Sequence, residues 1–177
     1  MKSKIISISA ISASLIAICL TLGCYIEVID LISVVTASVF VLLPLYFNSY
    51  KGCFLCYICG GVIALICSLP TLSFSIVMPA YFMFFGIYPI IKNIFNNRKL
   101  KKLCFFIGLV WCVCTSFVLY FYYTAIIGLT IANLPAIVSE YILPFVCAVA
   151  VIFYLIFDRF IFVAKLVMDK YIHKIIK

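Results

Sequence analysis

Residues 103–130 read LCFFIGLVWCVCTSFVLYFYYTAIIGLT, a stretch without a charged residue. A helix needs about 20 apolar residues to cross the roughly 30 Å hydrocarbon core of a bilayer. Similar apolar runs occupy residues 5–24, 31–47, 52–69, 71–91 and 136–157. The runs are continuous rather than alternating, which favours helices over strands of a barrel. We therefore expect an all-α integral membrane protein, one domain over 1–177, with six transmembrane helices in the lipid bilayer.

The composition excludes several classes of protein. The chain is 68% hydrophobic, and 10% of its residues are charged. Soluble domains are about 25% charged, so a soluble enzyme is excluded. The net charge of +8 belongs to a mostly apolar chain and not to a polar, solvent-exposed surface. Disorder and nucleic-acid binding are therefore excluded as well.

The basic residues predict the orientation. With six spans and a cytoplasmic N-terminus, every Lys and Arg falls on the cytoplasmic side: Lys2, Lys4, Lys51, Lys92, Arg98, Lys99, Lys101, Lys102, Arg159, Lys165, Lys170, Lys174 and Lys177. The outside segments carry Glu27, Asp30 and, near the start of the last span, Glu140. Because positive residues stay inside, we expect a multi-pass protein of the bacterial cytoplasmic membrane with both termini cytoplasmic.

The residues of common catalytic and metal sites are missing from the expected spans. The single His is His173, near the C-terminus, so a Ser-His or Cys-His pair within the membrane is excluded. The run Cys53-x2-Cys56-x2-Cys59 resembles the start of an iron–sulfur motif, but Ile63 stands at the fourth position. We expect no metal, no cofactor and no enzymatic activity, with the ten Cys acting as small apolar residues.

The first run allows two interpretations. Residues 20–24 read LTLGC, which resembles a bacterial lipobox with Cys24 as the lipidated residue. Thr21 stands where such motifs usually have Leu. An uncleaved first helix is the simpler interpretation, and lipidation of Cys24 stays open.

Small residues in the first run form a possible helix-packing face. Ala13-x3-Ala17 places two small side chains on one side of a helix, with Ser9 one turn earlier. Such faces let another helix approach closely in lipid. The partner is either a helix of this chain or a second protein.

Kinks and polar residues suggest a ligand cavity toward the outer face. Pro44, Pro79 and Pro144 lie within expected spans and each frees a backbone carbonyl. The candidate ligand-lining residues are Ser75, Trp111, Asn133 and Glu140. A carboxylate such as Glu140 is costly against lipid and either lines a cavity or sits at the water interface.

The cytoplasmic segments are strongly basic. The loop 92–102 carries five positive and no negative charges, which fits either an orientation signal or a docking surface. In the tail 158–177 the charges gather on one side of a helical wheel. We expect this tail to leave the membrane as a basic amphipathic helix on the inner leaflet. Asp158, at the end of the last span, stands beside Arg159 as an ion-pair neighbour.

The layout resembles the substrate-binding S components of energy-coupling-factor vitamin transporters, in which an Ala-x3-Ala motif on the first helix meets a coupling subunit. Ala13-x3-Ala17 matches that motif. A stretch containing Phe85, Gly86, Tyr88 and Pro89 (residues 84–92, FFGIYPIIK) looks like the FFGYYPILK stretch of a group of small membrane proteins from anaerobic Gram-positive bacteria. The exit around Asp158 looks like the YDY exit of that group.

The resemblance implies the substrate-binding component of a small-molecule importer. Its implied partners are a coupling transmembrane subunit and ABC-type ATPases. The alternative from the residues is a non-transport membrane scaffold or assembly factor that docks partners through its basic loop and tail.

Overall fold

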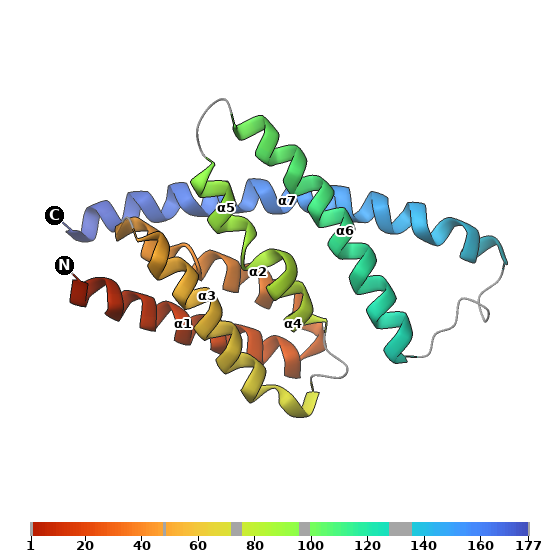
Figure 1. The fold of residues 1–177 in the computed structure, drawn as a ribbon, viewed down its shortest axis with the longest axis horizontal. Helices are drawn as coiled ribbons and strands as arrows, with labels where there is room; N and C mark the ends of the chain where they lie inside the picture. Colours follow the sequence, from red (N-terminus) through yellow and green to blue (C-terminus); the bar gives the residue numbers. More distant parts are fainter. Residues whose placement is uncertain (1, 48, 72–75, 96–99, 128–135, 177) are drawn as a thin grey trace.

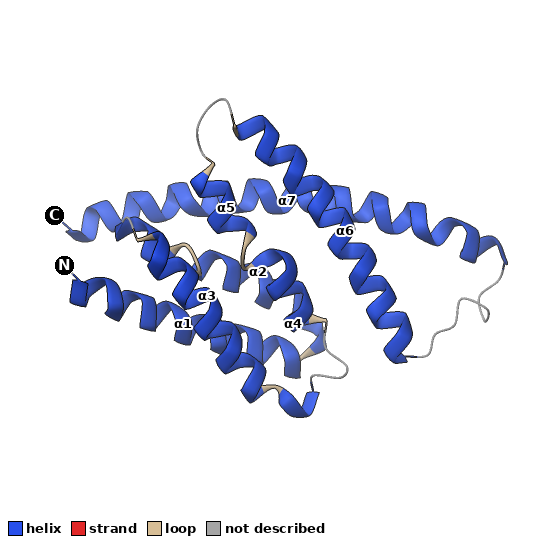
Figure 2. Cartoon of the chain, viewed as in Figure 1, coloured by secondary structure: helices blue, strands red, loops and turns tan. Residues whose placement is uncertain are grey.

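The computed structural model describes residues 2–47, 49–71, 76–95, 100–127 and 136–176, and the elements found there are helical (Figure 2). They are α1 (Lys2–Tyr25), α2 (Asp30–Phe40), α3 (Tyr50–Cys67), α4 (Val77–Ala80), the π-helical turn η4 (Tyr81–Phe85), α5 (Tyr88–Ile94), α6 (Lys101–Ile127) and α7 (Ala136–Ile176). Short 3-10 turns, η1 (Glu27–Ile29), η2 (Leu43–Phe47) and η3 (Leu69–Thr71), connect the first of these. The expected all-α class is confirmed.

Five helical segments in the described residues have the length and apolarity of a membrane span. They cover Ser3–Tyr25, Tyr50–Cys67, Val77–Ile94, Lys102–Tyr122 and Ile142–Lys170. The expected second span, 31–47, corresponds to an apolar helix over Asp30–Leu45, which is shorter than these five segments. The chain is thus an α-helical protein with several helices suited to a bilayer.

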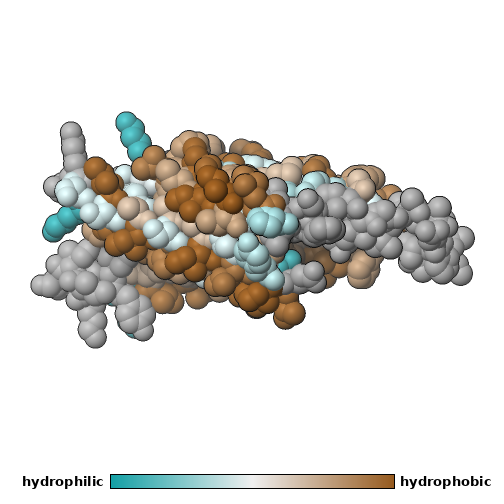
Figure 3. Space-filling model, turned by 90° about the horizontal axis from the view of Figure 1, so that it is seen from below, coloured by the Kyte–Doolittle hydropathy of each residue, from teal (hydrophilic) through white to brown (hydrophobic). Residues whose placement is uncertain are grey.

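Large apolar side chains cover the outside of the molecule. Phe106 and Phe145 are each 66% exposed, and Val28 is 90% exposed. Most of the coloured surface in Figure 3 is brown or pale, and much of its teal lies near one end. A water-soluble protein rarely exposes such a continuous apolar surface, whereas lipid tails solvate it.

The helices form two packed groups (Figure 1). Helix α1 lies along α3 and α2, and α6 crosses α7. The start of α1 and the end of α7 lie at the same end of the molecule. We call this end inner, because the charge pattern predicts it to be cytoplasmic, and the opposite end outer.

The small-residue face of α1 packs inside the chain. Ser9, Ala13 and Ala17 are 3%, 6% and 7% exposed. A Cβ added to Gly60 of α3 would lie 3.0 Å from the carbonyl oxygen of Ala13, so the two helices approach closely. Of the two partners left open by the sequence, α3 of the same chain occupies this face.

The fourth apolar run, expected over 71–91, forms one irregular helix over Val77–Ile94, and the regular α-helical hydrogen bonding breaks at Gly86. Helix α4 passes into η4, where the Gly86 amide donates to the Tyr81 carbonyl, five residues back, at 2.9 Å. A turn at Gly86 and Ile87 then separates η4 from α5. A Cβ at Gly86 would overlap the Tyr57 ring, so glycine lets α3 approach the break. Such π-turns are rare and occur frequently at functional sites.

The three prolines lie inside helical elements as expected, whereas the tail differs from the expectation. Pro79 lies within α4, but the break comes after it, at Gly86. Pro44 lies in η2, and Pro144 lies inside α7 without ending it. No helix end separates a last span at residue 157 from a tail at 158, because α7 runs unbroken for 41 residues.

We predict that Gly60→Leu lowers the stability of the fold, because the new side chain would displace Ile16 and Ala13 of α1. Overpacking of this kind costs about 1–3 kcal/mol. Thermal unfolding in mild detergent measures the change. The matched control is Val62→Leu, because Val62 is 45% exposed on the same helix. Equal melting temperatures for the two variants would contradict the α1–α3 contact.

Candidate functional site

A group of four polar side chains joins α5 to α7 within the apolar spans. We call Tyr88, Lys92, Tyr154 and Asp158 the inner polar cluster. The Lys92 Nζ donates to Asp158 Oδ1 at 2.5 Å and to the Asp158 backbone carbonyl at 2.8 Å. Tyr88 Oη donates to the same carboxylate oxygen. The Lys92 and Asp158 side chains are only 21% and 17% exposed.

The two tyrosines extend the cluster to α6. Tyr88 Oη and Tyr154 Oη lie 3.0 Å apart, and Tyr154 Oη lies 2.8 Å from the Phe105 carbonyl. A phenol has one proton to donate. Because Tyr88 gives its proton to Asp158, Tyr154 shares its own proton between Tyr88 and Phe105. Gly108 permits this arrangement, since a Cβ there would lie 2.6 Å from Tyr154 Oη.

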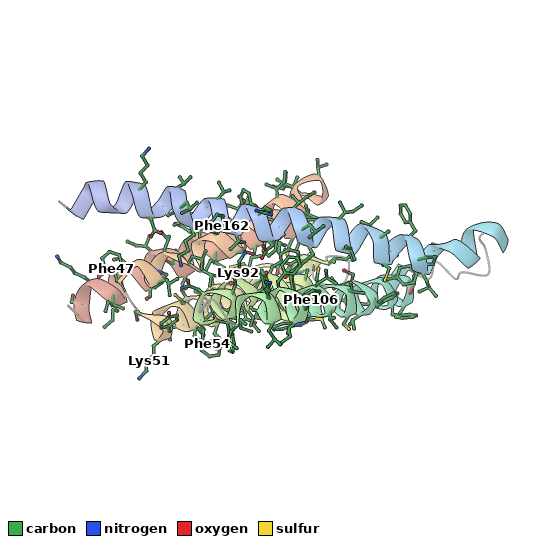
Figure 4. All side chains as sticks on the ribbon, turned by 90° about the horizontal axis from the view of Figure 1, so that it is seen from above. Phe47, Lys51, Phe54, Lys92, Phe106 and Phe162 are labelled. Carbon is green, nitrogen blue, oxygen red and sulfur yellow. The ribbon has the colours of Figure 1, made fainter. Side chains whose placement is uncertain are left out.

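The charges in this cluster compensate each other. A lone charge inside a membrane is expensive, and ionisable residues there usually pair and mark functional sites. Figure 4 shows Lys92 between α7 and the neighbouring helices, whereas Lys51 extends away from the ribbon. The Lys92 ammonium and the Asp158 carboxylate together carry no net charge.

The inner cavity lies beside this cluster and has a volume of about 320 Å³. Its charged lining residues are Lys92, Asp158, Lys165 and Asp169. The Lys165 Nζ donates to Asn93 Oδ1, a second polar contact between α7 and α5. The rest of the lining is mostly apolar and includes Leu42, Pro89, Phe95, Phe105, Ile161, Phe162 and Leu166.

The outer cavity lies on the other side of the break and has a volume of about 430 Å³. It is open at the surface of the molecule, where its lining residues Leu31 and Phe145 are 57% and 66% exposed. Its walls come from α2, α4, α6 and α7, with Asp30 and Ser116 as the polar members of the lining. The Ser116 hydroxyl donates to the Cys112 carbonyl of its own helix at 2.9 Å. The other lining residues are apolar: Leu31, Val34, Ile76, Val77, Ala80, Phe85, Leu119, Phe145, Val146, Val149, Ala150 and Phe153.

An aromatic layer separates the two cavities. It consists of Phe84, Phe85, Phe153 and Phe157. Phe85 and Phe153 line the outer cavity, and the Phe85 ring packs edge-on against Phe157 at 4.9 Å. The Phe84 ring stacks on Tyr88 at 5.0 Å, so this layer rests directly on the inner polar cluster.

The structure brings together the two stretches singled out by resemblance. Tyr88 of the first stretch donates to Asp158 of the second, although 70 positions separate them in sequence. Phe85 belongs to the aromatic layer, Gly86 forms the break, and Pro89 is buried in the first turn of α5. Asp158 pairs with Lys92, whereas its expected neighbour Arg159 is exposed.

Of the four expected ligand-lining residues, the structure describes the side chain of Trp111, which lines a smaller pocket of about 90 Å³ beside Tyr88. Trp111 packs edge-on against Phe84 at 6.2 Å and lines neither the inner nor the outer cavity. Ser75 and Asn133 lie outside the described residues, and so does the side chain of Glu140 in α7.

Several of the cysteines are buried among apolar side chains of the core. Cys53 and Cys56 are each 1% exposed, and Cys24 is 7% exposed. Among the residues that the structure describes, no cluster of three potential metal ligands was found.

Sequence reasoning missed Lys92 and Tyr154. Lys92 was counted as part of the basic loop. The available signal is spacing, since Tyr88 precedes Lys92 and Tyr154 precedes Asp158 by four residues. Residues four apart share one helix face, so each pair forms a short polar strip.

We predict that Lys92→Met alone costs about 3 kcal/mol of stability, because it leaves a carboxylate unpaired in the span. The double variant Lys92→Met/Asp158→Leu should recover most of this loss, since no charge then remains. Thermal unfolding in detergent measures both. Arg159→Met is the control, because its side chain is exposed. A double variant that is less stable than either single one would refute the pairing.

No family model matches the chain, and no curated protein or solved structure matches it either.

Proposed function

We propose that the chain is the membrane-embedded solute-binding component of a small-molecule importer, comparable in role to an energy-coupling-factor S component. The outer cavity is the seat of the solute. Its volume of about 430 Å³ carries this proposal, because binding sites for small molecules span about 300–1,000 Å³.

The chemistry of the outer cavity selects the solute. Burying an unpaired polar group costs several kcal/mol, and the lining offers few polar partners. A sugar or a phosphate is thus disfavoured, and a mainly apolar or aromatic molecule is favoured. Asp30 adds a negative charge to the lining. A cationic group on the solute therefore gains from complementarity, and an anionic group loses.

The broken fourth span supports a transport role. Single π-turns inside α-helices are rare and occur frequently at functional sites. Here η4 and the Gly86–Ile87 turn lie between the outer and inner cavities.

The proposal includes six crossings with both ends cytoplasmic. The helix over Asp30–Leu45 supplies the sixth crossing, and local thinning of the bilayer accommodates its short length. An even number of crossings agrees with the α1 start and α7 end at one end of the molecule (Figure 1). The basic residues then face the cytoplasm of a bacterial cell.

A coupling subunit needs a face of α1 other than the buried Ala13–Ala17 face. Ser7, Ala10 and Ser14 are exposed on a second face. The Ser7 and Ser14 hydroxyls donate to carbonyls one turn back, at 3.1 and 3.0 Å. This second face is therefore small and internally satisfied, which suits close approach of a partner helix in lipid.

The first test measures probe binding to the full chain in lipid nanodiscs. The probes are naphthylmethylammonium, methylnaphthalene and naphthoate, which share an aromatic body and differ in charge. We predict that the cation binds best and the anion worst. Asp30→Asn should remove the difference between the cation and the neutral probe. Fluorescence of the probes gives the dissociation constants.

A filling variant locates the binding. Val146→Phe narrows the outer cavity and should weaken binding of the cation by about tenfold or more, which is 1.4 kcal/mol. Ile152→Phe is the matched control on the same helix, because Ile152 is 59% exposed. Equal affinities in the two variants would exclude the outer cavity as the seat.

The second test concerns the coupling partner. We expect gentle detergent extraction of a tagged copy to recover a coupling membrane subunit with ABC-type ATPases, and Ala10→Leu/Ser14→Leu to lose them. The control is Val110→Leu, because Val110 is 59% exposed and lies on a different helix, α6. Mass spectrometry identifies the proteins. The scaffold function would instead be favoured by two results together. The chain would recover unrelated partner proteins, and charge reversal at Lys99, Lys101 and Lys102 would release them.

A further inference from the structure

The short helix α5 is the inner half of the broken span, and polar contacts hold it. At its start, the turn at Gly86 and Ile87 interrupts the regular helical hydrogen bonding between η4 and α5. Toward α7 it is fixed by Tyr88 and Lys92 on Asp158 and by Asn93 on Lys165. The seven residues of α5 thus carry three side chains that bond α7.

These contacts lie where a path between the cavities would have to open. The outer cavity ends on Phe85 and Phe153 of the aromatic layer. Beneath it, Tyr88 stacks on Phe84 and lines the inner cavity. A solute in the outer cavity therefore reaches the inner cavity only if α5 and its rings move relative to α7.

We propose that the inner polar cluster is a latch that keeps the inner cavity closed to the outer one, and that the inner cavity is the exit site of the same solute path. The part of this inference that concerns a solute path rests on the proposed function. The latch itself is a property of α5 and α7 and can be tested without any solute.

The chemistry of the cluster suits a latch rather than a permanent brace. A buried ion pair is a poor source of stability, because desolvation offsets much of the Coulomb attraction. The pair does define one closed geometry, because the hydrogen bonds among Lys92, Tyr88 and Asp158 form only when α5 and α7 are in contact. The inner cavity offers Lys92 another carboxylate, that of Asp169, once the cluster separates.

The native cysteines provide a reporter and an internal control. Cys104 lines the inner cavity and is 9% exposed. Cys112 lies two turns farther along α6, is 4% exposed, and lines neither the inner nor the outer cavity. Opening of the latch should expose Cys104 and leave Cys112 covered, whereas general loosening of the fold should expose both.

The experiment measures the rate of N-ethylmaleimide labelling of each cysteine in the full chain in nanodiscs, by mass spectrometry of peptides. We expect Lys92→Met to raise the Cys104 rate by about tenfold or more, because loss of one partner of a buried pair favours opening. Loss of the nearby positive charge by itself would disfavour the reactive thiolate and lower the rate. Tyr88→Phe should raise the rate less, since the Lys92–Asp158 pair remains. Arg159→Met, which alters the adjacent charge outside the cluster, should leave it unchanged.

The outcomes separate the latch from the proposed function. Unchanged Cys104 labelling in Lys92→Met and Tyr88→Phe, or an equal rise at Cys104 and Cys112, would overturn the latch. Binding of naphthylmethylammonium is measured on the same samples. A responsive Cys104 in a chain that binds no probe keeps the latch and rejects the solute path. A bound probe with an unresponsive Cys104 rejects the latch and keeps the outer cavity as the seat.

Discussion

Charges buried between apolar helices must be neutralised where they lie, and in this chain the Lys92–Asp158 pair meets that requirement. The pair joins the inner half of the fourth span to α7, and the hydroxyl of Tyr88 adds a third group to the same carboxylate. The position of α5 depends on these bonds, because regular helix ends on its outer side at Gly86. The aromatic layer is built on top, with Phe84 stacked on Tyr88.

The two packed groups of helices obey different rules. Between α1 and α3, small residues and Gly60 allow close van der Waals contact, which is a principal source of helix association in lipid. Between α5 and α7, aromatic rings and charged groups make the contact. The first kind of interface is insensitive to water and protonation, whereas the second can separate when polar partners become available. This contrast places conformational change at the broken span rather than along α1.

The two cavities differ in the solute chemistry they accept. An outer cavity with apolar walls and a carboxylate favours an apolar solute with a cationic group, and an inner cavity with four charged residues offers polar contacts near the inner end of the molecule. A solute that moves from the first to the second would leave a hydrophobic seat for a more hydrated one. The scaffold alternative gives no role to this difference, although it uses the basic loop and tail.

The sequence by itself determined the helical class and the apolar runs, because a stretch such as 103–130 can satisfy its backbone in lipid only as a helix. It also singled out Tyr88 and Asp158, but in separate motifs. Tertiary structure alone decided that they meet, that Lys92 rather than Arg159 pairs with Asp158, and that α3 occupies the Ala13 face. It also placed the break at Gly86 and kept α7 continuous past residue 157. Hydropathy reports the preference of each residue for lipid, whereas pairing across 66 positions depends on how whole helices pack.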